Sequence, residues 1–496
     1  MQRILYVAFD HLHREHGVLR GSDPANDVVV LVESERMLRA HRWHRQRLWF
    51  LLSAARHFAR DLEAAGYVVN YRRSATTADG IATIRTEYPE REVWATEPSS
   101  HRLTTALTDI GVRFVPNDFF LTTRGDFAAW ANSQKSLLME NFYRAQRRRL
   151  GILMDGDQPV GGRWNFDAEN RLGPPKNYTY PPYLTHAFDD IDEAVLRDIA
   201  ELDLWGAAPD GTWGTTRAAA LQQLNHFLDH NFAAFGPYED AMPAEQWAVH
   251  HSLLSPYMNV GLLHAREIVD AAIARFERGD IPIESCEGFI RQVIGWREYV
   301  NGLYWHFEES YRDANELAAG RPLLPLFDDP TATRMRCVGN IVTDVEQRAW
   351  VHHIPRLMVL SNLALLAGLN PQEFLQWMRE RFIDAADWVM VPNVIGMGVH
   401  ADGGRMMTKP YAAGGAYISR MGNYCKGCAY DPKLRTGETA CPFTTLYWDF
   451  LDRHRDDFAR NHRMAQQVRG LDRLSDLDAV RARAAEVLGT LERGAC

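Results

Sequence analysis

The chain has 496 residues, of which 46% are hydrophobic and 24% charged, and its formal net charge is -9. This composition is typical of a globular protein that is too long for one simple core, so we expect two or more domains. The negative charge argues against a protein that coats nucleic acid indiscriminately, but it is compatible with a local basic face.

Apolar runs long enough to cross a membrane do not occur in the sequence, and the N-terminal segment becomes polar too early for a signal peptide. We therefore expect a cytoplasmic protein with no membrane contact, and a monomer.

The first part of the chain alternates strand patterns with helix patterns. Apolar runs predict strands over 4–9, 27–32, 67–71, 92–95 and 113–115, and an amphipathic stretch predicts a helix over 36–64. This alternation is typical of an open, doubly wound and mostly parallel α/β sheet, which binds ligands at the carboxyl ends of its strands.

From about residue 133 the strand pattern fades. Proline pairs at 174–175 and 181–182 predict a stiff connector, and amphipathic helical patterns follow it. The sequence thus predicts an α/β domain over 1–132, a connector over 133–185 and an all-helical domain over 186–496.

Four of the six cysteines have the spacing of metal ligands. Cys425 and Cys428 form a C-x-x-C pair, Cys441 follows thirteen residues later, and Cys337 precedes the pair by 88 residues. In a reducing cytoplasm such a set is better interpreted as ligands than as disulfides. The spacing alone leaves a zinc site and an iron–sulfur cluster open. The cysteines that fit no such pattern are Cys286 and Cys496.

Residues 252–263 combine hydroxyl groups, a proline turn and a glycine before an amphipathic run. Amide groups at such a helix start can bind a phosphate, although Ser255-Pro256 is also an ordinary way to begin a helix. The segment therefore indicates a phosphate-binding site only in combination with the motifs around it.

Those motifs are L-S-P-Y at 254–257, W-R-E at 296–298, GGRWNFDAENR at 161–171, ADWVMVPNVIGMG at 386–398 and the segment 407–428 that ends in C-x-x-C. Their order resembles the photolyase/cryptochrome flavoproteins, and within them the iron–sulfur bacterial cryptochromes and prokaryotic (6-4) photolyases. The resemblance covers nearly the whole chain. It implies an N-terminal antenna domain and a C-terminal FAD-binding domain.

The resemblance implies an FAD site in the helical domain. Arg356 and Asp387 would form an ion pair beside the flavin ring, and the amide of Asn393 would lie next to its central ring nitrogen and tune the cofactor. Three residues would hold the FAD pyrophosphate: Ser252, Leu254 and Ser255. The other predicted contacts with the cofactor are Tyr238, Trp296 and Glu298.

A histidine pair is the predicted centre of the chemistry. Repair of a (6-4) lesion needs a proton for the hydroxyl that is transferred back, and a histidine is an apt donor. By the resemblance His353 has this role and His352 stands beside it. The side chains implied on the substrate side are Met397, Tyr411 and Tyr417, and the carboxylates implied for a divalent cation such as Mg²⁺ are Asp167 and Asp240.

Three further expectations follow from the resemblance. It favours a 4Fe-4S cluster over zinc at the four cysteines, and it places Trp377 in an electron-transfer chain. It also implies a 6,7-dimethyl-8-ribityllumazine antenna at the ends of the first strands, where the candidate contacts are Phe9, Asp10, Glu33 and Glu35. Separately, the run Arg147–Arg149 is basic enough to meet DNA phosphates.

Taken together, the sequence predicts a (6-4) DNA photolyase. In such an enzyme excited reduced FAD transfers an electron to the lesion in UV-damaged DNA. Two alternatives stay open at this point: a cryptochrome-type signalling photoreceptor, and a nucleic-acid-binding module without photochemistry that resembles the large primase subunit.

Overall fold

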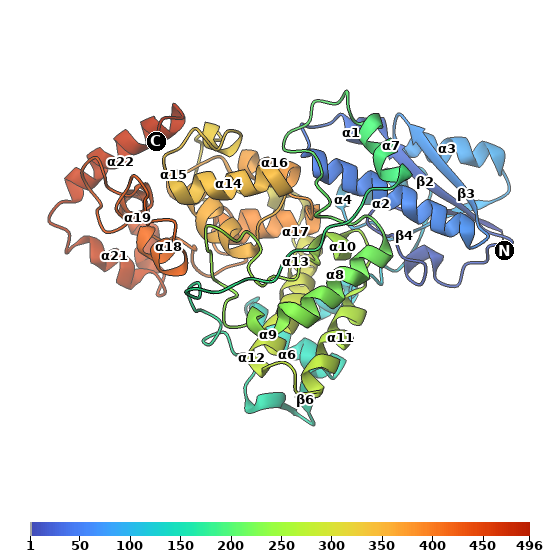
Figure 1. Ribbon diagram of the computed structural model, residues 1–496, viewed down its shortest axis with the longest axis horizontal. Helices are drawn as coiled ribbons and strands as arrows, with labels where there is room; N and C mark the ends of the chain where they lie inside the picture. Colours follow the sequence, from blue (N-terminus) through green and yellow to red (C-terminus); the bar gives the residue numbers. More distant parts are fainter. Residues whose placement is uncertain (1) are drawn as a thin grey trace.

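The computed structural model describes residues 2–496. A sheet with its helices forms one end of the molecule, and the C-terminal helices form the other (Figure 1). The described chain begins in the part with the sheet and finishes among the C-terminal helices. None of the helices described combines the length and the apolar character that crossing a membrane requires.

The sheet has five parallel strands, β1 (Arg3–Tyr6), β2 (Val28–Ser34), β3 (Val68–Ser74), β4 (Glu92–Thr96) and β5 (Arg113–Val115), in the order β3-β2-β1-β4-β5. The chain thus reverses direction across the sheet between β1 and β4. This confirms the predicted parallel sheet.

Helices cover both faces of the sheet, as alternating buried side chains require. Leu5 and Leu31 pack on the side of α2 (Arg45–Ala64), whereas Ile4 and Val30 pack with Ile81 of α3 (Thr77–Glu87). The other helices of this part are α1 (Glu35–Leu38), α4 (His101–Asp109) and α5 (Arg124–Asn132).

The rest of the chain is helical apart from one short antiparallel hairpin, β6 (Met154–Asp155) with β7 (Gln158–Pro159). The α-helices are α6 (Met139–Leu150), α7 (Asp190–Asp198), α8 (Arg217–His230), α9 (Phe232–Phe235), α10 (Ser255–Asn259), α11 (Ala265–Glu277), α12 (Ile283–Ile290), α13 (Glu298–His306), α14 (Arg336–Arg348), α15 (Asn362–Ala367), α16 (Pro371–Arg381), α17 (Asp387–Val391), α18 (Gly415–Met421), α19 (Pro442–Arg453), α20 (Arg455–Arg460), α21 (Ala465–Leu471) and α22 (Leu477–Glu492). Short 3₁₀ turns are η1 (Gly17–Leu19), η2 (Val160–Gly162), η4 (Glu309–Asp313) and η5 (Pro325–Phe327).

Three segments are π-helical: η3 (Arg291–Arg297), η6 (Pro355–Ser361) and η7 (Pro392–Gly398). Each is continuous with an α-helix, η3 with α13, η6 with α15 and η7 with α17. A π-turn widens a helix locally and is often found at functional sites. These three segments are therefore the first structural indication of where the site lies.

The predicted helix over 36–64 is two helices, α1 and α2, separated by a break before His44. The break has a structural reason, because His44 caps α2 with its Nδ1 atom, which accepts from the Gln46 amide at 3.1 Å. Its Nε2 atom donates to the carbonyls of Val345 and Glu346, both at 2.9 Å. His44 thus ties α2 to the end of α14.

This buried contact predicts a loss of stability in acid. Burial lowers the pKa of His44 from 6.5 to about 4, so the folded protein resists the proton that the unfolded chain accepts. Stability present above pH 6.5 should be lost as the pH falls towards 4, by up to about 3 kcal/mol from this residue. Thermal unfolding midpoints at pH 7.5 and 5.0 should differ less in His44→Asn than in the wild type; equal differences would contradict the assignment.

Candidate functional site

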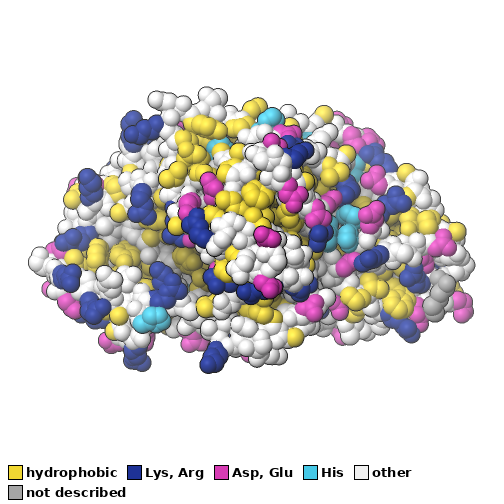
Figure 2. All heavy atoms as spheres, turned by 90° about the horizontal axis from the view of Figure 1, so that it is seen from below, with side chains coloured by type: hydrophobic (Ala, Val, Ile, Leu, Met, Phe, Trp, Pro, Cys, Tyr) yellow, Lys and Arg dark blue, Asp and Glu magenta, His cyan; other side chains and the backbone are white. Residues whose placement is uncertain are grey.

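A large cavity lies among the three π-helical segments. Its volume is about 780 Å³, and a smaller cavity of about 310 Å³ shares part of its wall. On the face shown in Figure 2, a hollowed apolar area lies left of centre with Lys and Arg side chains near its edge. The predicted site residues that line one or both cavities are Asp167, Asp240, Ser252, Leu254, Ser255, Trp296, His352, His353, Arg356, Asn393, Met397, Tyr411 and Tyr417.

The ion pair at the cavity wall differs from the one predicted. Arg356 donates from both terminal nitrogens to Asp384, at 2.9 and 3.0 Å, and not to Asp387. Asp387 begins α17 and accepts from Arg379 at 2.7 Å, outside the large cavity. The prediction of an Arg356–Asp387 pair is therefore wrong. The reason is the loop 382–386, which turns Asp384 inward before α17 begins.

Asp384 is also bonded to the wall that was predicted to hold a phosphate. Its carboxylate accepts from the Ser255 hydroxyl at 2.6 Å, and that hydroxyl accepts from the Trp350 indole at 3.2 Å. Ser255 is thus held in place beside Ser252 and Leu254 on the cavity wall.

We expect Asp384→Asn to weaken cofactor binding strongly, because it leaves the guanidinium of Arg356 without its anion in a largely buried place. The affected side chains are 17% and 8% exposed. The loss should reach about 3–5 kcal/mol in stability, cofactor affinity or both. Flavin retained after purification is the measurement, and Asp387→Asn is the matched control, whose flavin content should stay near that of the wild type.

Three further residues, predicted to contact the FAD or to carry electrons to it, line neither cavity. Glu298 is buried and bonded to the Thr122 amide at 2.8 Å and to Arg297 at 2.7 Å, so it orients the cavity residue Arg297. Tyr238 packs its ring against His250, and Trp377 donates its indole N–H to the Phe327 carbonyl. Direct FAD contact by Glu298 is therefore wrong, since its carboxylate is already paired inside the protein.

The histidine pair occupies the junction of the two cavities. His353 begins the helix that continues into η6, its side chain is 46% exposed, and its Nε2 atom lies 3.9 Å from the Asp240 carboxylate. His352 is buried, and its Nδ1 atom has no hydrogen-bond partner. Only the second member of the pair therefore faces open space.

The pKa values of His353 and Asp240 are shifted in opposite directions. Desolvation and then Arg356 lower the pKa of His353 to about 4, whereas desolvation raises the pKa of Asp240 to about 6. Both shifts disfavour charge in the free protein. An anionic ligand in the cavity would favour the cationic form of His353.

The three residues predicted for the substrate side line the same cavity. Met397 comes from η7, Tyr417 from α18, and Tyr411 from the loop before α18, and all three line the large cavity. Burial raises the pKa of both tyrosines, which therefore present neutral rings. The cationic residues Arg171, Lys409 and Arg420 line the same cavity.

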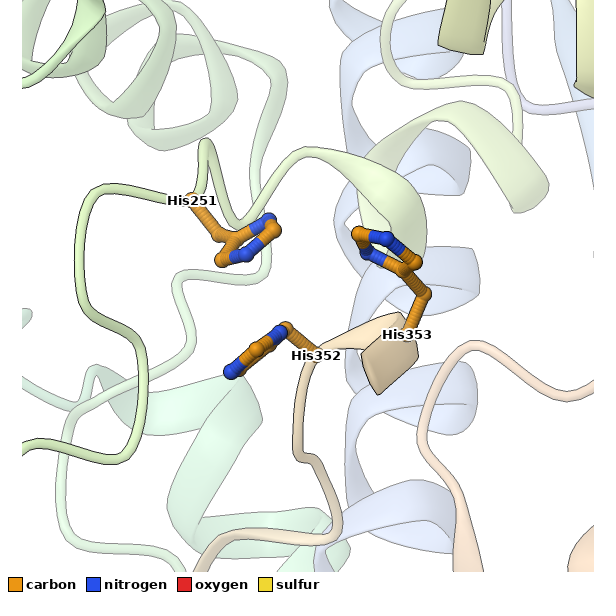
Figure 3. Close-up of side chains that lie close together, drawn as sticks. All are labelled: His251, His352 and His353. Carbon is orange, nitrogen blue, oxygen red and sulfur yellow. The ribbon is translucent and has the colours of Figure 1, made fainter. Parts of the chain in front are cut away.

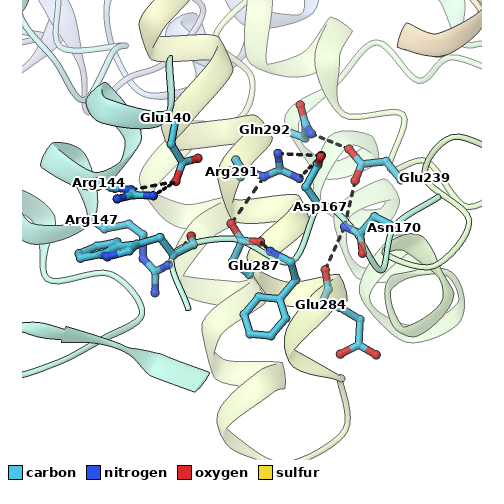
Figure 4. Close-up of polar contacts among 12 residues, drawn as sticks. Glu140, Arg144, Arg147, Asp167, Asn170, Glu239, Glu284, Glu287, Arg291 and Gln292 are labelled. Carbon is cyan, nitrogen blue, oxygen red and sulfur yellow. Dashed lines mark hydrogen bonds and ion pairs between the residues drawn. The ribbon is translucent and has the colours of Figure 1, made fainter. Parts of the chain in front are cut away.

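On the wall of the large cavity a partly buried polar network holds the segment 161–171 (Figure 4). Both terminal nitrogens of Arg291 donate to one oxygen of Asp167 at 3.1 Å, and Arg171 pairs with the other oxygen. Because two guanidinium groups already neutralise Asp167, the prediction that it binds a divalent cation is not supported by its contacts. Glu239 accepts from Asn170 at 3.2 Å and from Gln292 at 2.5 Å.

The basic run at the end of α6 is structural in part. Arg147 is fully buried and donates to the Trp164 carbonyl at 2.9 Å, and Arg149 donates to the Leu121 carbonyl at 2.6 Å. The predicted phosphate contact is wrong for Arg147, because the side chain is closed off from solvent.

The four predicted cysteine ligands converge on one small pocket. Cys337 comes from α14, Cys425 and Cys428 follow α18, and Cys441 immediately precedes α19. All four are free thiols, and burial together with the other three raises the pKa of Cys337 well above its usual value. A Cβ at Gly415 would lie 2.8 Å from the Cys441 sulfur, so only glycine fits where α18 begins.

At the strand ends, one of the predicted antenna contacts is already used by the protein. Glu33 is 1% exposed and accepts from Arg56 at 2.8 Å and from Tyr71 at 2.7 Å. Phe9 stacks on Tyr71, and Glu35 pairs with Arg73. Glu33 is therefore a buried structural carboxylate and not a free ligand, which corrects that prediction.

The residues of the cavity walls that sequence patterns missed include Asp384, Arg291 and His251. Asp384 precedes Asp387 by three residues, and the sequence does not show which of the two carboxylates pairs with Arg356. Arg291 belongs to a π-turn that helical periodicity does not reveal. His251 precedes the predicted phosphate segment directly, and this proximity was the available signal.

Two solved structures share this fold over most of their length. A bacterial class III photolyase from Agrobacterium tumefaciens matches with a TM-score of 0.56 and 16% identity, covering 99% of this chain and 98% of that one. A cryptochrome from Synechocystis sp. PCC6803 matches with a TM-score of 0.55 and 15% identity, covering 80% and 82%. The fold with its large cavity is therefore that of the photolyase/cryptochrome class.

Sequence comparison is more specific. The family model described as deoxyribodipyrimidine photo-lyase-related protein matches residues 5–213. A protein of Agrobacterium fabrum (strain C58 / ATCC 33970) named (6-4) photolyase is 40% identical over 512 residues, covering 99% of this chain and all of that protein. The chain belongs to the prokaryotic (6-4) photolyase family, which confirms the predicted resemblance.

Proposed function

We propose that this protein repairs (6-4) pyrimidine–pyrimidone photoproducts in DNA in a light-driven reaction, with His353 as the proton donor. The observation that carries the proposal is the full-length similarity to a protein of that name, together with an exposed histidine in a cavity that Arg356, Tyr411 and Tyr417 also line. The monomeric state stays a prediction.

The cavity residues suit an FAD. A volume of about 780 Å³ lies in the range of small-molecule sites, and hydroxyls, five arginines and two tryptophan rings, Trp296 and Trp388, line it. The Asn393 amide nitrogen donates to the Val389 carbonyl at 2.8 Å, which leaves its oxygen free to accept from a protonated ring nitrogen. Reduced FAD, when bound, supplies the electron on excitation by light.

The protein groups around the lesion have separate tasks. His353 in its cationic form donates a proton to the hydroxyl that is transferred back, and it takes the proton up again afterwards. Asp240, 3.9 Å away, favours that cation when its carboxyl is ionised, and the phosphates of a bound strand favour the cation directly. Tyr411, Tyr417 and Met397 offer surfaces on which a base taken out of the duplex stacks.

DNA contact at the cavity mouth is assigned to Arg171, Lys409 and Arg420, which line the cavity without closing it. Each phosphate that they neutralise adds salt-dependent affinity. They replace the buried Arg147 of the sequence-based prediction. Of the two carboxylates predicted to bind a divalent cation, only Asp240 remains a candidate. We do not assign a metal ion to it.

A 4Fe-4S cluster at the four cysteines is part of the proposal. No three of their sulfur atoms lie within 4.8 Å of one another. Tetrahedral zinc, with zinc–sulfur bonds of about 2.3 Å, would hold its ligands about 3.8 Å apart. The wider spacing supports a multi-iron cluster. A lumazine antenna near Phe9, Asp10 and Glu35, and electron transfer through Trp377, stay predictions.

The decisive experiment is illumination of the reduced holoprotein with an oligonucleotide that carries one (6-4) photoproduct. Repair predicts restored adjacent pyrimidines that depend on blue or near-UV light. Intact bound FAD without restored pyrimidines would favour the signalling photoreceptor, and absence of a flavin absorption band after purification would favour the nucleic-acid-binding module.

A further inference from the structure

A third histidine packs against the histidine pair. His251, in the loop before α10, stacks on His352 with ring centroids 4.2 Å apart and planes inclined by 21° (Figure 3). Its ring lies 5.4 Å from that of His353 at an angle of 74°. The three rings form a group in which His251 touches both members of the pair.

His251 is itself held rigidly. Its Nε2 atom donates to the Glu239 carbonyl at 3.1 Å, and its ring meets Phe235 at 5.5 Å and Trp350 at 6.4 Å. Desolvation lowers the pKa of both His251 and His352 well below the ordinary value. Both inner rings are therefore neutral, and the Glu239 carbonyl sets the tautomer of His251.

One short segment contacts all three histidines. Glu239 receives the hydrogen bond of His251, Asp240 lies 3.9 Å from His353, and the Ala241 backbone lies close enough to His352 to raise its pKa slightly against the effect of burial. The outer histidine is the one with a carboxylate partner and an exposed side chain. The group thus divides into two neutral inner rings and one outer ring that can carry a proton.

The arrangement of the three histidines does not suit a shared metal ion. One ligand atom from each ring lies within 4.8 Å of the others. However, lone pairs of an imidazole lie in the ring plane, and the nearly parallel planes of His251 and His352 do not direct theirs at a common centre.

We propose that His251 is a positioning residue for the repair reaction, a neutral aromatic platform that fixes His352 and thereby aims His353 into the cavity. The inference rests on the proposed function. Because the platform acts through ring packing, its shape matters and its ability to exchange protons does not. A displacement of His353 of about 1 Å would suffice to reduce the rate up to about 10²-fold.

The test compares His251→Ala and His251→Phe in the FAD-loaded holoprotein. Repair per absorbed photon, the Kd for the (6-4) oligonucleotide and the flavin content are measured for each. We expect His251→Ala to lower the repair yield about tenfold or more, with Kd and flavin content near the wild type. His251→Phe should restore most of the yield. His250→Ala, a change in the neighbouring buried histidine outside the group, should repair normally.

Each other outcome overturns the assignment. Normal repair by His251→Ala would show that the platform is not needed. A Phe variant as poor as the Ala variant would show that proton exchange or the hydrogen bond to Glu239 is what matters. Loss of flavin in both variants would show that His251 supports only the cofactor cavity. If the wild type itself repairs nothing, the proposed function fails instead.

Discussion

Replacement of His353 by alanine is expected to lower the repair of a (6-4) oligonucleotide by about 10²–10⁴-fold, the usual contribution of a positioned general acid. The side chain is 46% exposed in the cavity and is no part of the buried core. The fold and the flavin content should therefore change little. Repair yield under defined blue illumination, normalised to bound flavin, is the measurement.

The same role predicts a direction of pH dependence. Only the cationic imidazole can donate, so repair in the DNA complex should fall as the pH rises through the pKa that His353 has there. A matched control is His230→Ala, at the exposed end of α8, which should repair as the wild type does. Retained repair in His353→Ala, with flavin and DNA bound normally, would refute the assigned role.

The sequence predicted the elements whose signals are local or are carried by motifs. Strand and helix alternation anticipated the parallel sheet, because strands buried on both faces read as apolar runs. The four cysteines were recognised from their spacing, whereas the role of His353 was implied by the family resemblance. In the structure the four cysteines converge on one small pocket, and His353 lines the separate large cavity.

What escaped prediction was the partner of each charged group. Glu33, Asp167 and Arg147 are all residues with an expected ligand, and each is instead paired within the protein. Sequence does not show whether a carboxylate points into a cavity or at a distant arginine. Asp384 replaces Asp387 for the same reason, since one loop turn decides which carboxylate faces Arg356.

The shape of the cavity could not be predicted from the sequence either. Its walls come from three π-helical segments, and a π-turn differs from an α-turn by one residue inserted into an unchanged apolar pattern. Arg291, Arg356 and Asn393 lie in these segments and line the large cavity. Helical periodicity predicts the helices but does not reveal such insertions.

Loss of one ligand of the proposed cluster should have the largest effect on stability. Cys425→Ala is expected to lower the unfolding free energy of the helical part by more than about 4 kcal/mol, the range in which single substitutions reflect the loss of a metal site. The cysteines join α14, the loop after α18 and the start of α19, which are distant in sequence. Without the cluster, buried thiols are left with no centre to hold them.

The consequences should extend to the lesion cavity. Cys337 lies in the helix that precedes His352 and His353, and Cys425 follows the segment with Tyr411 and Tyr417. We therefore expect Cys425→Ala to lose iron, the broad absorption of the cluster and most of its flavin. Iron content, flavin content and the denaturant midpoint are the measurements.

Cys286→Ala provides the matched control, because Cys286 is fully buried in α12 but lies outside the four-cysteine pocket. It should cost only about 1 kcal/mol, the ordinary effect of a point substitution, and should keep both cofactors. A Cys425→Ala protein that is stable and fully loaded with FAD would show that the cluster does not hold the two halves of the cavity together. Such a result would mean that the cysteine ligands are not needed for the structure around the lesion. The cluster would then have another role.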